Sequence, residues 1–248
     1  MYKKMFNFFG NKEKVLEKEK NKLMHDLENG GIRQLVLKMG SNEFYSILIK
    51  EKHEKEGSFA SDDYISHYAY KVSSGLNNTI YKTELLELLA DASYSPYKKY
   101  IFCCLASLCS NTTDYQLFDF LLKHISGEDD EEIIVSILSR LDEIVKPASV
   151  DISVIKKNLI EGNQHTRRAA IKALCNCRHS EVEDLLLDEF KVSDKHTKSS
   201  ICGPLQSVGT TKSIPVLKSA YKATRDPWLR HNIEYTLNAI SERGSVTD

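Results

Sequence analysis

Residues 226–240 read Asp-Pro-Trp-Leu-Arg-His-Asn-Ile-Glu-Tyr-Thr-Leu-Asn-Ala-Ile. Ile233, Leu237 and Ile240 stand at the spacing that places side chains on one face of an α-helix. The stretch therefore predicts an amphipathic helix that buries one apolar stripe. The same arrangement recurs upstream, and this repetition decides the fold.

Three apolar columns repeat at nearly constant offsets along the chain. The central column consists of Leu105, Leu138, Leu174, Leu205 and Leu237, at spacings of 33, 36, 31 and 32 residues. Four residues earlier stand Ile101, Ile134, Ala170, Ile201 and Ile233. Three residues later stand Leu108, Leu141, Cys177, Val208 and Ile240. The columns predict five related first helices that bury equivalent stripes.

A second helix is predicted after the first helix in four of these copies. Twelve residues after their column leucines stand Leu117, Leu186 and Leu217, and four residues further stand Leu121, Phe190 and Tyr221. The copy that begins near Glu131 uses Val154, Ile155 and Leu159 instead, after an extra loop at residues 146–149. The connections are short, so consecutive helices are expected to pack antiparallel. Period-2 alternation typical of strands is missing.

The predicted fold is all-α, a right-handed α-solenoid of antiparallel helix pairs over residues 95–248. Residues 1–94 are expected to form an irregular helical region, either degenerate repeats or a cap that covers one end. Its helices are predicted at residues 11–29, 32–39, 43–56 and 62–73. Before them, Lys3 and Lys4 with Phe6, Phe8 and Phe9 are expected to fray or to pack on the first helices, with a weak interfacial anchor as the alternative.

A basic residue stands seven positions before most column leucines: Lys98, Arg167, Lys198 and Arg230, with Glu131 in the remaining copy. A helix–turn–helix unit of this length, with a basic residue near the start of its first helix, resembles a HEAT-type repeat. The resemblance covers about residues 95–241 and is clearest at residues 226–240 and 166–174. It implies a protein-binding solenoid, because HEAT-like proteins act as adaptors, regulatory subunits and inhibitors. Small bacterial examples can be immunity proteins that neutralise a toxin.

Composition excludes several other classes of protein. The 248 residues are 41% hydrophobic, with a formal charge of −1 and a mean hydropathy of −0.38. No run approaches the 18 apolar residues of a membrane span, and the first residues lack the apolar core of a signal peptide. The six cysteines fall in apolar stretches interpreted as helical, so reduced, buried thiols and a cytoplasmic location are expected.

Catalytic and metal-binding motifs are not evident. The sequence contains no Walker, dinucleotide-binding, HExxH or GxSxG motif, so no catalytic residue and no cofactor is predicted. Cys175, Cys177 and His179 have the spacing of metal ligands, but on a helix residues i and i+2 point far apart. No metal site is therefore predicted. His165, His196 and His231 fall at the starts of first helices, where surface polar residues are expected.

The candidate partner-binding residues lie on the last two second helices and on the final first helix. They are Asp184, Asp188, Lys212, Lys218, Tyr221, Lys222, Trp228 and Arg230. The acidic and basic helices predict either exposed ion pairs between repeats or a groove for one charged protein partner. Trp228 either seals the last repeat or anchors a partner. The acidic run at residues 128–132 marks a helix start or a docking patch for a basic partner.

The main alternative follows from a HEAT-like branch of DNA glycosylases that remove alkylated bases. In that interpretation Lys98, Arg167, Arg168, Lys198 and Arg230 contact phosphates, and Asp226 beside Trp228 supplies the carboxylate. Residues 61–160 hold 9 basic and 15 acidic side chains, which disfavours a nucleic-acid partner. A role like that of phycobiliprotein lyases is a third possibility.

Overall fold

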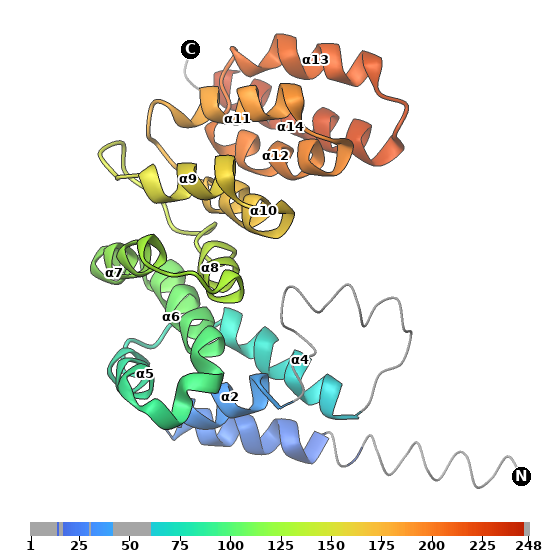
Figure 1. The fold of residues 1–248 in the computed structure, drawn as a ribbon. Helices are drawn as coiled ribbons and strands as arrows, with labels where there is room; N and C mark the ends of the chain where they lie inside the picture. Colours follow the sequence, from blue (N-terminus) through green and yellow to red (C-terminus); the bar gives the residue numbers. More distant parts are fainter. Residues whose placement is uncertain (1–13, 15–16, 30, 42–60, 246–248) are drawn as a thin grey trace, which may run out of the picture. The chain divides into compact units, whose positions relative to one another are not determined.

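The computed structural model describes residues 14, 17–29, 31–41 and 61–245 (Figure 1). The predicted helix at residues 43–56 and the aromatic arm before residue 10 lie outside these ranges. Within them every regular element is a helix, and the only β-type pairing is one isolated bridge between Lys146 and Cys177. The predicted all-α class is confirmed.

The chain divides into two compact units. The first contains Met1–Leu121 and Glu128–Ile137, and the second contains Leu122–Gly127 and Leu138–Asp248. A domain boundary between residues 94 and 95 stays a prediction.

Helix α6 is the buried centre of the first unit. The helices of this unit are residues 17–28, α2 (Ile32–Met39), α4 (Ser61–Ser74), α5 (Tyr81–Ala90), the 3₁₀ helix η1 (Ala92–Tyr97), α6 (Lys98–Thr112) and most of α8 (Glu131–Leu138). Every residue from Tyr100 to Ser110 is buried, and α6 contacts α2, α4 and α5. A helix covered on several sides must be apolar nearly all round, which explains the Cys- and Leu-rich sequence of α6. Helix α7 (Tyr115–Ser126) is divided, with residues up to Leu121 in the first unit and the rest in the second.

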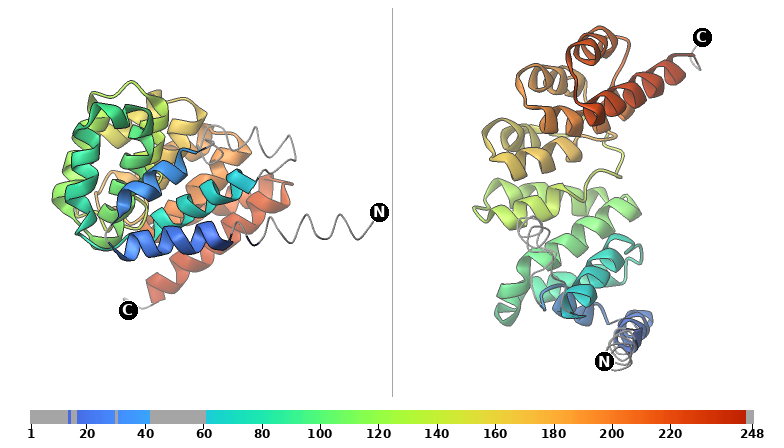
Figure 2. Two further views of the ribbon diagram at one scale, coloured as in Figure 1. Left: turned by 90° about the horizontal axis from the view of Figure 1, so that it is seen from below. Right: turned by 90° about the vertical axis from the view of Figure 1, so that its right-hand side faces the viewer.

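The second unit consists of stacked helix pairs. Its helices are α9 (Ser153–Glu161), α10 (Gln164–Ala173), α11 (Val182–Val192), α12 (Lys195–Val208), α13 (Ser213–Ala223) and α14 (Pro227–Ser245). The first helices form a row, since α10 contacts α12 and α12 contacts α14. The second helices α11 and α13 pack on α12 and α14 and touch each other (Figures 1 and 2). The predicted α-solenoid arrangement of helix pairs is confirmed here.

The first helices of this unit share one start signal. This signal is Asn163, Asp194 or Asp226, which each stand eleven residues before a column leucine. Each side chain accepts hydrogen bonds of 2.7–3.1 Å from two backbone N–H groups. Such N-caps satisfy donors that have no partner within the helix. They fix where α10, α12 and α14 begin. His165 and His196 lie in the first turns of α10 and α12, and His231 lies in the second turn of α14.

The apolar columns are confirmed as the core. Twelve of the fifteen column residues are buried, and Ile134, Val208 and Leu237 are half-buried. The second-helix positions Leu117, Leu186 and Leu217 are also buried.

Two first helices end earlier than predicted. Helix α8 ends at Leu138 and α10 at Ala173, so Leu141, Cys175 and Cys177 are not helical. The helical placement of Cys175 and Cys177 was therefore wrong, and with it the argument that helix geometry separates Cys177 from Cys175.

A backbone pairing explains these early ends. The Lys146 N–H donates to the Asn176 carbonyl at 2.9 Å, and the Arg178 N–H donates to the Lys146 carbonyl at 2.9 Å. Asn176 adopts the left-handed conformation, with φ of 54°, which turns the chain out of α10.

Lys146, in the predicted loop at residues 146–149, is fully buried. Its Nζ donates hydrogen bonds to the carbonyls of Leu141 (2.6 Å), Ile144 (2.9 Å) and Cys175 (2.8 Å). Because α8 and α10 end early, these carbonyls have no helical N–H group to bond, and the Lys146 ammonium supplies the hydrogen bonds instead.

Candidate functional site

Helices α11 and α13 form the part of the second unit where most predicted binding residues lie. Each buries one face, through Val182, Leu186, Leu187 and Phe190 in α11 and through Ser213 and Leu217 in α13. Asp184, Asp188, Lys218 and Lys222 lie on the remaining faces and are exposed.

The two helices run in the same direction. Lys212, just before α13, forms an ion pair with Asp184 in the first turn of α11. At the other end, Phe190 and Lys191 of α11 and Ala223 of α13 line a common groove. The acidic second helix and the basic one therefore meet side by side.

The charges on this surface divide into a paired and an unpaired group. Lys212 pairs with Asp184, and this hydrogen bond raises the pKa of Lys212. Asp188 pairs with Lys191 at 2.8 Å, which lowers the pKa of Asp188. In contrast, Lys218 and Lys222 are exposed and have no ion pair within the described residues. Ion pairing between repeats thus accounts for Lys212 and Asp184 but not for these two lysines.

A groove of about 450 Å³ lies between α11, α13 and the start of α12. Its apolar lining includes Phe190, Pro215, Val216, Ala220 and Ala223, and its two cationic lining residues are Lys191 and Lys198. None of the eight predicted residues lines this groove, although Lys222 directly precedes Ala223. Sequence reasoning missed it because the lining residues come from three helices.

A cation over an aromatic ring recurs in two successive repeats. The Lys198 Nζ lies 5.8 Å from the centre of the Phe190 ring, and the Arg230 guanidinium lies 4.4 Å from the Tyr221 ring. Phe190 and Tyr221 occupy equivalent positions, as do Lys198 and Arg230. The structure therefore brings the predicted residues Tyr221 and Arg230 together, and each contact joins a second helix to the next first helix.

Trp228 does not seal the last repeat. Its side chain is 67% exposed at the start of α14, with its ring centre 6.2 Å from that of His231. Leu229, the next residue, is buried instead. The sealing interpretation was wrong, and a contact with a partner stays a prediction.

Asp226, the carboxylate of the glycosylase alternative, has a structural role. One oxygen caps α14 by accepting from the N–H groups of Trp228 and Leu229, and the other accepts from Lys195 Nζ at 2.8 Å. The hydrogen bond from Lys195 lowers the pKa of Asp226. A carboxylate with a lowered pKa is a weaker base, so this geometry does not favour proton abstraction.

The basic residues at the starts of other first helices also make internal contacts. Arg167 donates from Nε to the Leu159 carbonyl at 3.1 Å and lies 3.7 Å from Glu189. Lys98 pairs with Glu128 at 3.2 Å. These contacts give Arg167 and Lys98 roles within the fold.

The acidic run at residues 128–132 starts α8. Asp130 accepts hydrogen bonds from the N–H groups of Glu132 and Ile133, and Glu132 pairs with Lys99 at 2.5 Å. The helix-start interpretation of this run is confirmed, and two of its five carboxylates, Glu128 and Glu132, form ion pairs with Lys98 and Lys99.

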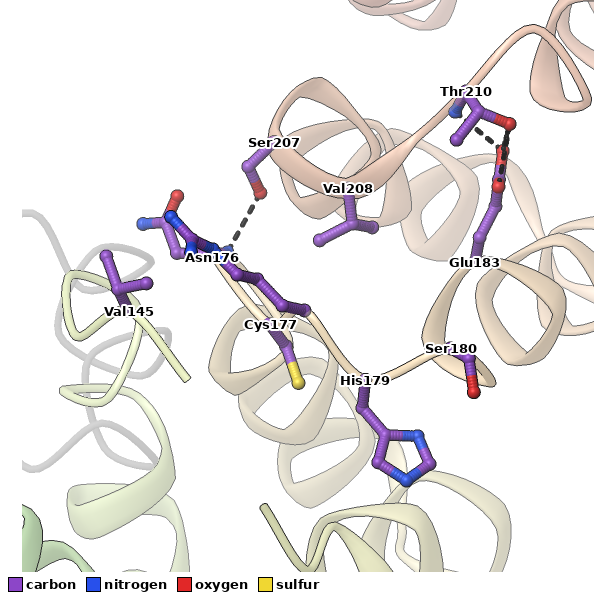
Figure 3. Close-up of a pocket in the computed structure, with 10 residues that line it drawn as sticks. Val145, Asn176, Cys177, His179, Ser180, Glu183, Ser207, Val208 and Thr210 are labelled. Atoms are coloured by element: carbon purple, nitrogen blue, oxygen red, sulfur yellow. Dashed lines mark hydrogen bonds between the residues drawn. The ribbon is translucent and has the colours of Figure 1, made fainter. Parts of the chain in front are cut away.

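A polar pocket of about 410 Å³ lies beside the loop that follows α10 (Figure 3). The Asn176 N–H donates to Ser207 Oγ at 2.9 Å. The Glu183 carboxylate accepts from the Thr210 N–H (2.7 Å), from Thr210 Oγ1 and from Ser213 Oγ (2.6 Å). The first bond connects the loop after α10 to α12, and the others connect the start of α11 to the loop before α13 and to its first residue. We therefore interpret these polar groups as contacts that hold neighbouring repeats in position.

The thiols are poorly suited to nucleophilic or metal chemistry. None of the six cysteines, all within the described residues, forms a disulfide, and five are buried. Burial raises the pKa of Cys175 and of Cys202 to about 11 and also raises that of Cys177. No group of three or more potential metal ligands occurs among the described residues.

The comparisons with known proteins agree with the helix pairs. The family model of HEAT repeats matches residues 152–238, which span α9 to most of α14. Comparison with curated proteins and with solved structures gave no match. No helix in the described ranges is long and apolar enough to cross a membrane. Residues 152–238, within the second unit, therefore resemble HEAT repeats both in sequence and in the stacking of their helices.

Proposed function

We propose that this chain is a non-catalytic protein that binds one protein partner in the cytoplasm and acts as an adaptor, regulatory subunit or inhibitor. An immunity protein that neutralises a toxin belongs to the inhibitor class. The observation that carries the proposal is the α11–α13 surface, where second helices of adjoining HEAT repeats lie side by side. Repeat proteins use such extended surfaces to bind other proteins.

Exposed residues on and beside this surface have the chemistry of an interface. Lys218 and Lys222 present cations without an ion pair within the described residues, while Asp184 and Asp188 present exposed carboxylates on the neighbouring helix α11. Tyr221, Trp228 and Arg230 supply the residue types that most often anchor protein interfaces. With Lys212, these eight residues are the proposed binding set.

Affinity capture from source-cell lysate with the full chain as bait tests the proposal. Capture is performed after nuclease treatment, at roughly 150 mM and 500 mM salt, because nucleic-acid contacts weaken steeply with salt. We expect one near-stoichiometric protein that remains bound at both salt concentrations. Bound material that disappears with nuclease would contradict the proposal and support the nucleic-acid alternative.

A further inference from the structure

The groove between α11 and α13 has an apolar floor. Phe190 forms its base, and Pro215, Val216 and Ala223 line its α13 side. Val192, which follows the lining residue Lys191 at the end of α11, is 81% exposed. A volume of about 450 Å³ accommodates one or two apolar side chains of a polypeptide.

Three cations without ion pairs among the described residues lie in this groove or on the helix beside it. Lys198 lines the groove, Lys222 precedes Ala223, and Lys218 lies one turn earlier on α13. Within the described residues none of the three has a carboxylate at ion-pair distance.

The carboxylates near the groove already have other contacts. Asp188 pairs with Lys191, Glu189 lies 3.7 Å from Arg167, and Asp226 pairs with Lys195. Asp194 caps α12. The chain therefore leaves a net positive rim around an apolar floor, although its formal charge is −1.

We propose that this groove binds an acidic polypeptide segment of the partner, with an apolar side chain on the floor and flanking carboxylates on Lys198, Lys218 and Lys222. This inference rests on the proposed function, because it specifies the chemistry of the partner. Complementary charge sets the register and speeds association, while the apolar side chain supplies buried area.

The lining favours a polypeptide over a nucleic acid. Nucleic acids are bound through rows of phosphate contacts, with aromatic faces on which bases stack. Here Phe190 is the only aromatic residue of the lining and is 1% exposed, so it offers no open face for stacking, and the other apolar lining residues are Pro, Val and Ala. An apolar wall of this kind matches an aliphatic or aromatic side chain of a peptide.

A random 12-residue peptide library displayed on phage, selected on the full chain, tests the specificity of the groove. We expect enriched peptides to combine an apolar residue with two or more nearby carboxylates. A synthetic copy of the most enriched peptide then provides the binding probe, measured by fluorescence anisotropy at roughly 50 mM and 300 mM salt. Affinity should fall at the higher salt concentration.

Two variants and one matched control locate the site. Ala223→Glu, at an exposed lining position, places a carboxylate in the groove, and Lys198→Glu reverses a rim charge. Each should lower the affinity for the peptide probe about tenfold or more, since the new carboxylate repels the carboxylates of the peptide. Lys157→Glu on α9, exposed and outside the groove, should leave affinity within about twofold. Circular dichroism verifies that all three variants keep their helices.

The outcomes separate this inference from the proposed function. Enriched peptides without carboxylates, or unchanged binding by both groove variants, would overturn the acidic-segment proposal. If the captured partner still binds the same variants, the proposed function stands and only the groove assignment fails. A 20-nucleotide single-stranded DNA that binds as tightly as the peptide, and is weakened by the same variants, would overturn the polypeptide assignment.

Discussion

Lys198 places its ammonium nitrogen 5.8 Å from the centre of the Phe190 ring, across the boundary between two repeats. Phe190 is buried at the base of the groove, so the contact holds a cation directly above apolar surface. Arg230 and Tyr221 repeat the relationship one unit later. In these two repeats the first helix thereby places a positive charge over an aromatic ring of the preceding second helix.

Replacing Lys146 should strongly destabilise the chain. Lys146→Met keeps most of the buried volume but removes the donor to three carbonyls in the interior. Because an unsatisfied buried polar group costs about 1–3 kcal/mol, we expect a loss of about 3 kcal/mol or more in the free energy of unfolding. Urea denaturation followed by circular dichroism measures it. The control Lys157→Met, at an exposed position, should stay within about 0.5 kcal/mol. A similarly small effect at Lys146 would contradict the buried position of its ammonium.

The helix cap at Asn163 should contribute measurably to stability. Asn163→Ala removes the acceptor for the N–H groups of His165 and Thr166. We expect a loss of about 1 kcal/mol in the free energy of unfolding, and a smaller loss for Asn163→Asp, which retains an acceptor. Equal stability of the alanine variant and the natural chain in urea titrations would show that this cap is dispensable.

Asp194 should make part of the stability dependent on pH. Backbone donors from Thr197 and His196 favour the carboxylate and lower its pKa below the ordinary 3.8 in the folded chain. A lowered folded-state pKa gives a contribution that is complete above the unfolded value and is lost as pH falls through the folded value. Asp194→Asn keeps the cap without the charge. Its free energy of unfolding should therefore decline less steeply between about pH 5 and pH 2. If the free energy of unfolding depends on pH equally in the variant and in the natural chain, the pKa of Asp194 is not lowered in the folded chain.

Thiol reactivity should be low in the folded chain. A pKa of about 11 for Cys175 and Cys202 leaves about a hundredfold less thiolate than the ordinary value of 9 at neutral pH. Alkylation with iodoacetamide at about pH 8, read by mass spectrometry, should be slow until denaturant is added. Rapid stoichiometric labelling of Cys202 in the folded chain would contradict its burial against α14.

Trp228 should be open to solvent and unimportant for stability. It is the only tryptophan, so quenching of intrinsic emission by acrylamide reports on it alone. We expect quenching of the folded chain close to that of the unfolded chain, because the side chain is 67% exposed. Trp228→Ala should change the free energy of unfolding by less than about 0.5 kcal/mol. A strongly protected indole would restore the sealing interpretation.

The sequence predicts the helix pairs well because the apolar columns record burial directly. Leu174 and Leu205 are buried where the 31-residue spacing places them, and α2 occupies the predicted residues 32–39. The early end of α10 could not be predicted, because it depends on Lys146 hydrogen bonding to a carbonyl 29 residues away. Because lysine is rarely fully buried, nothing in the sequence indicated that Lys146 lies in the core.

The candidate site was predicted only in part, for a similar reason. Charge patterns identified α11 and α13, and the pair between Lys212 and Asp184 follows from their opposite signs. The groove depends on residues such as Pro215 and Ala223, which carry no distinctive chemistry and become significant only beside Lys198. Trp228 was misplaced because its apolar size favours burial, whereas the buried stripe of α14 begins at Leu229.

The affinity of the captured partner for charge-reversed chains tests the central claim most directly. Titration calorimetry would compare the natural chain with Lys218→Glu/Lys222→Glu and with the control Lys123→Glu/Lys157→Glu, which makes the same change in net charge at exposed positions outside this surface. If the α11–α13 surface is the interface, the first pair should raise Kd by about tenfold or more, and the control should leave it within about threefold. Equal Kd values for all three chains would contradict binding through α11 and α13.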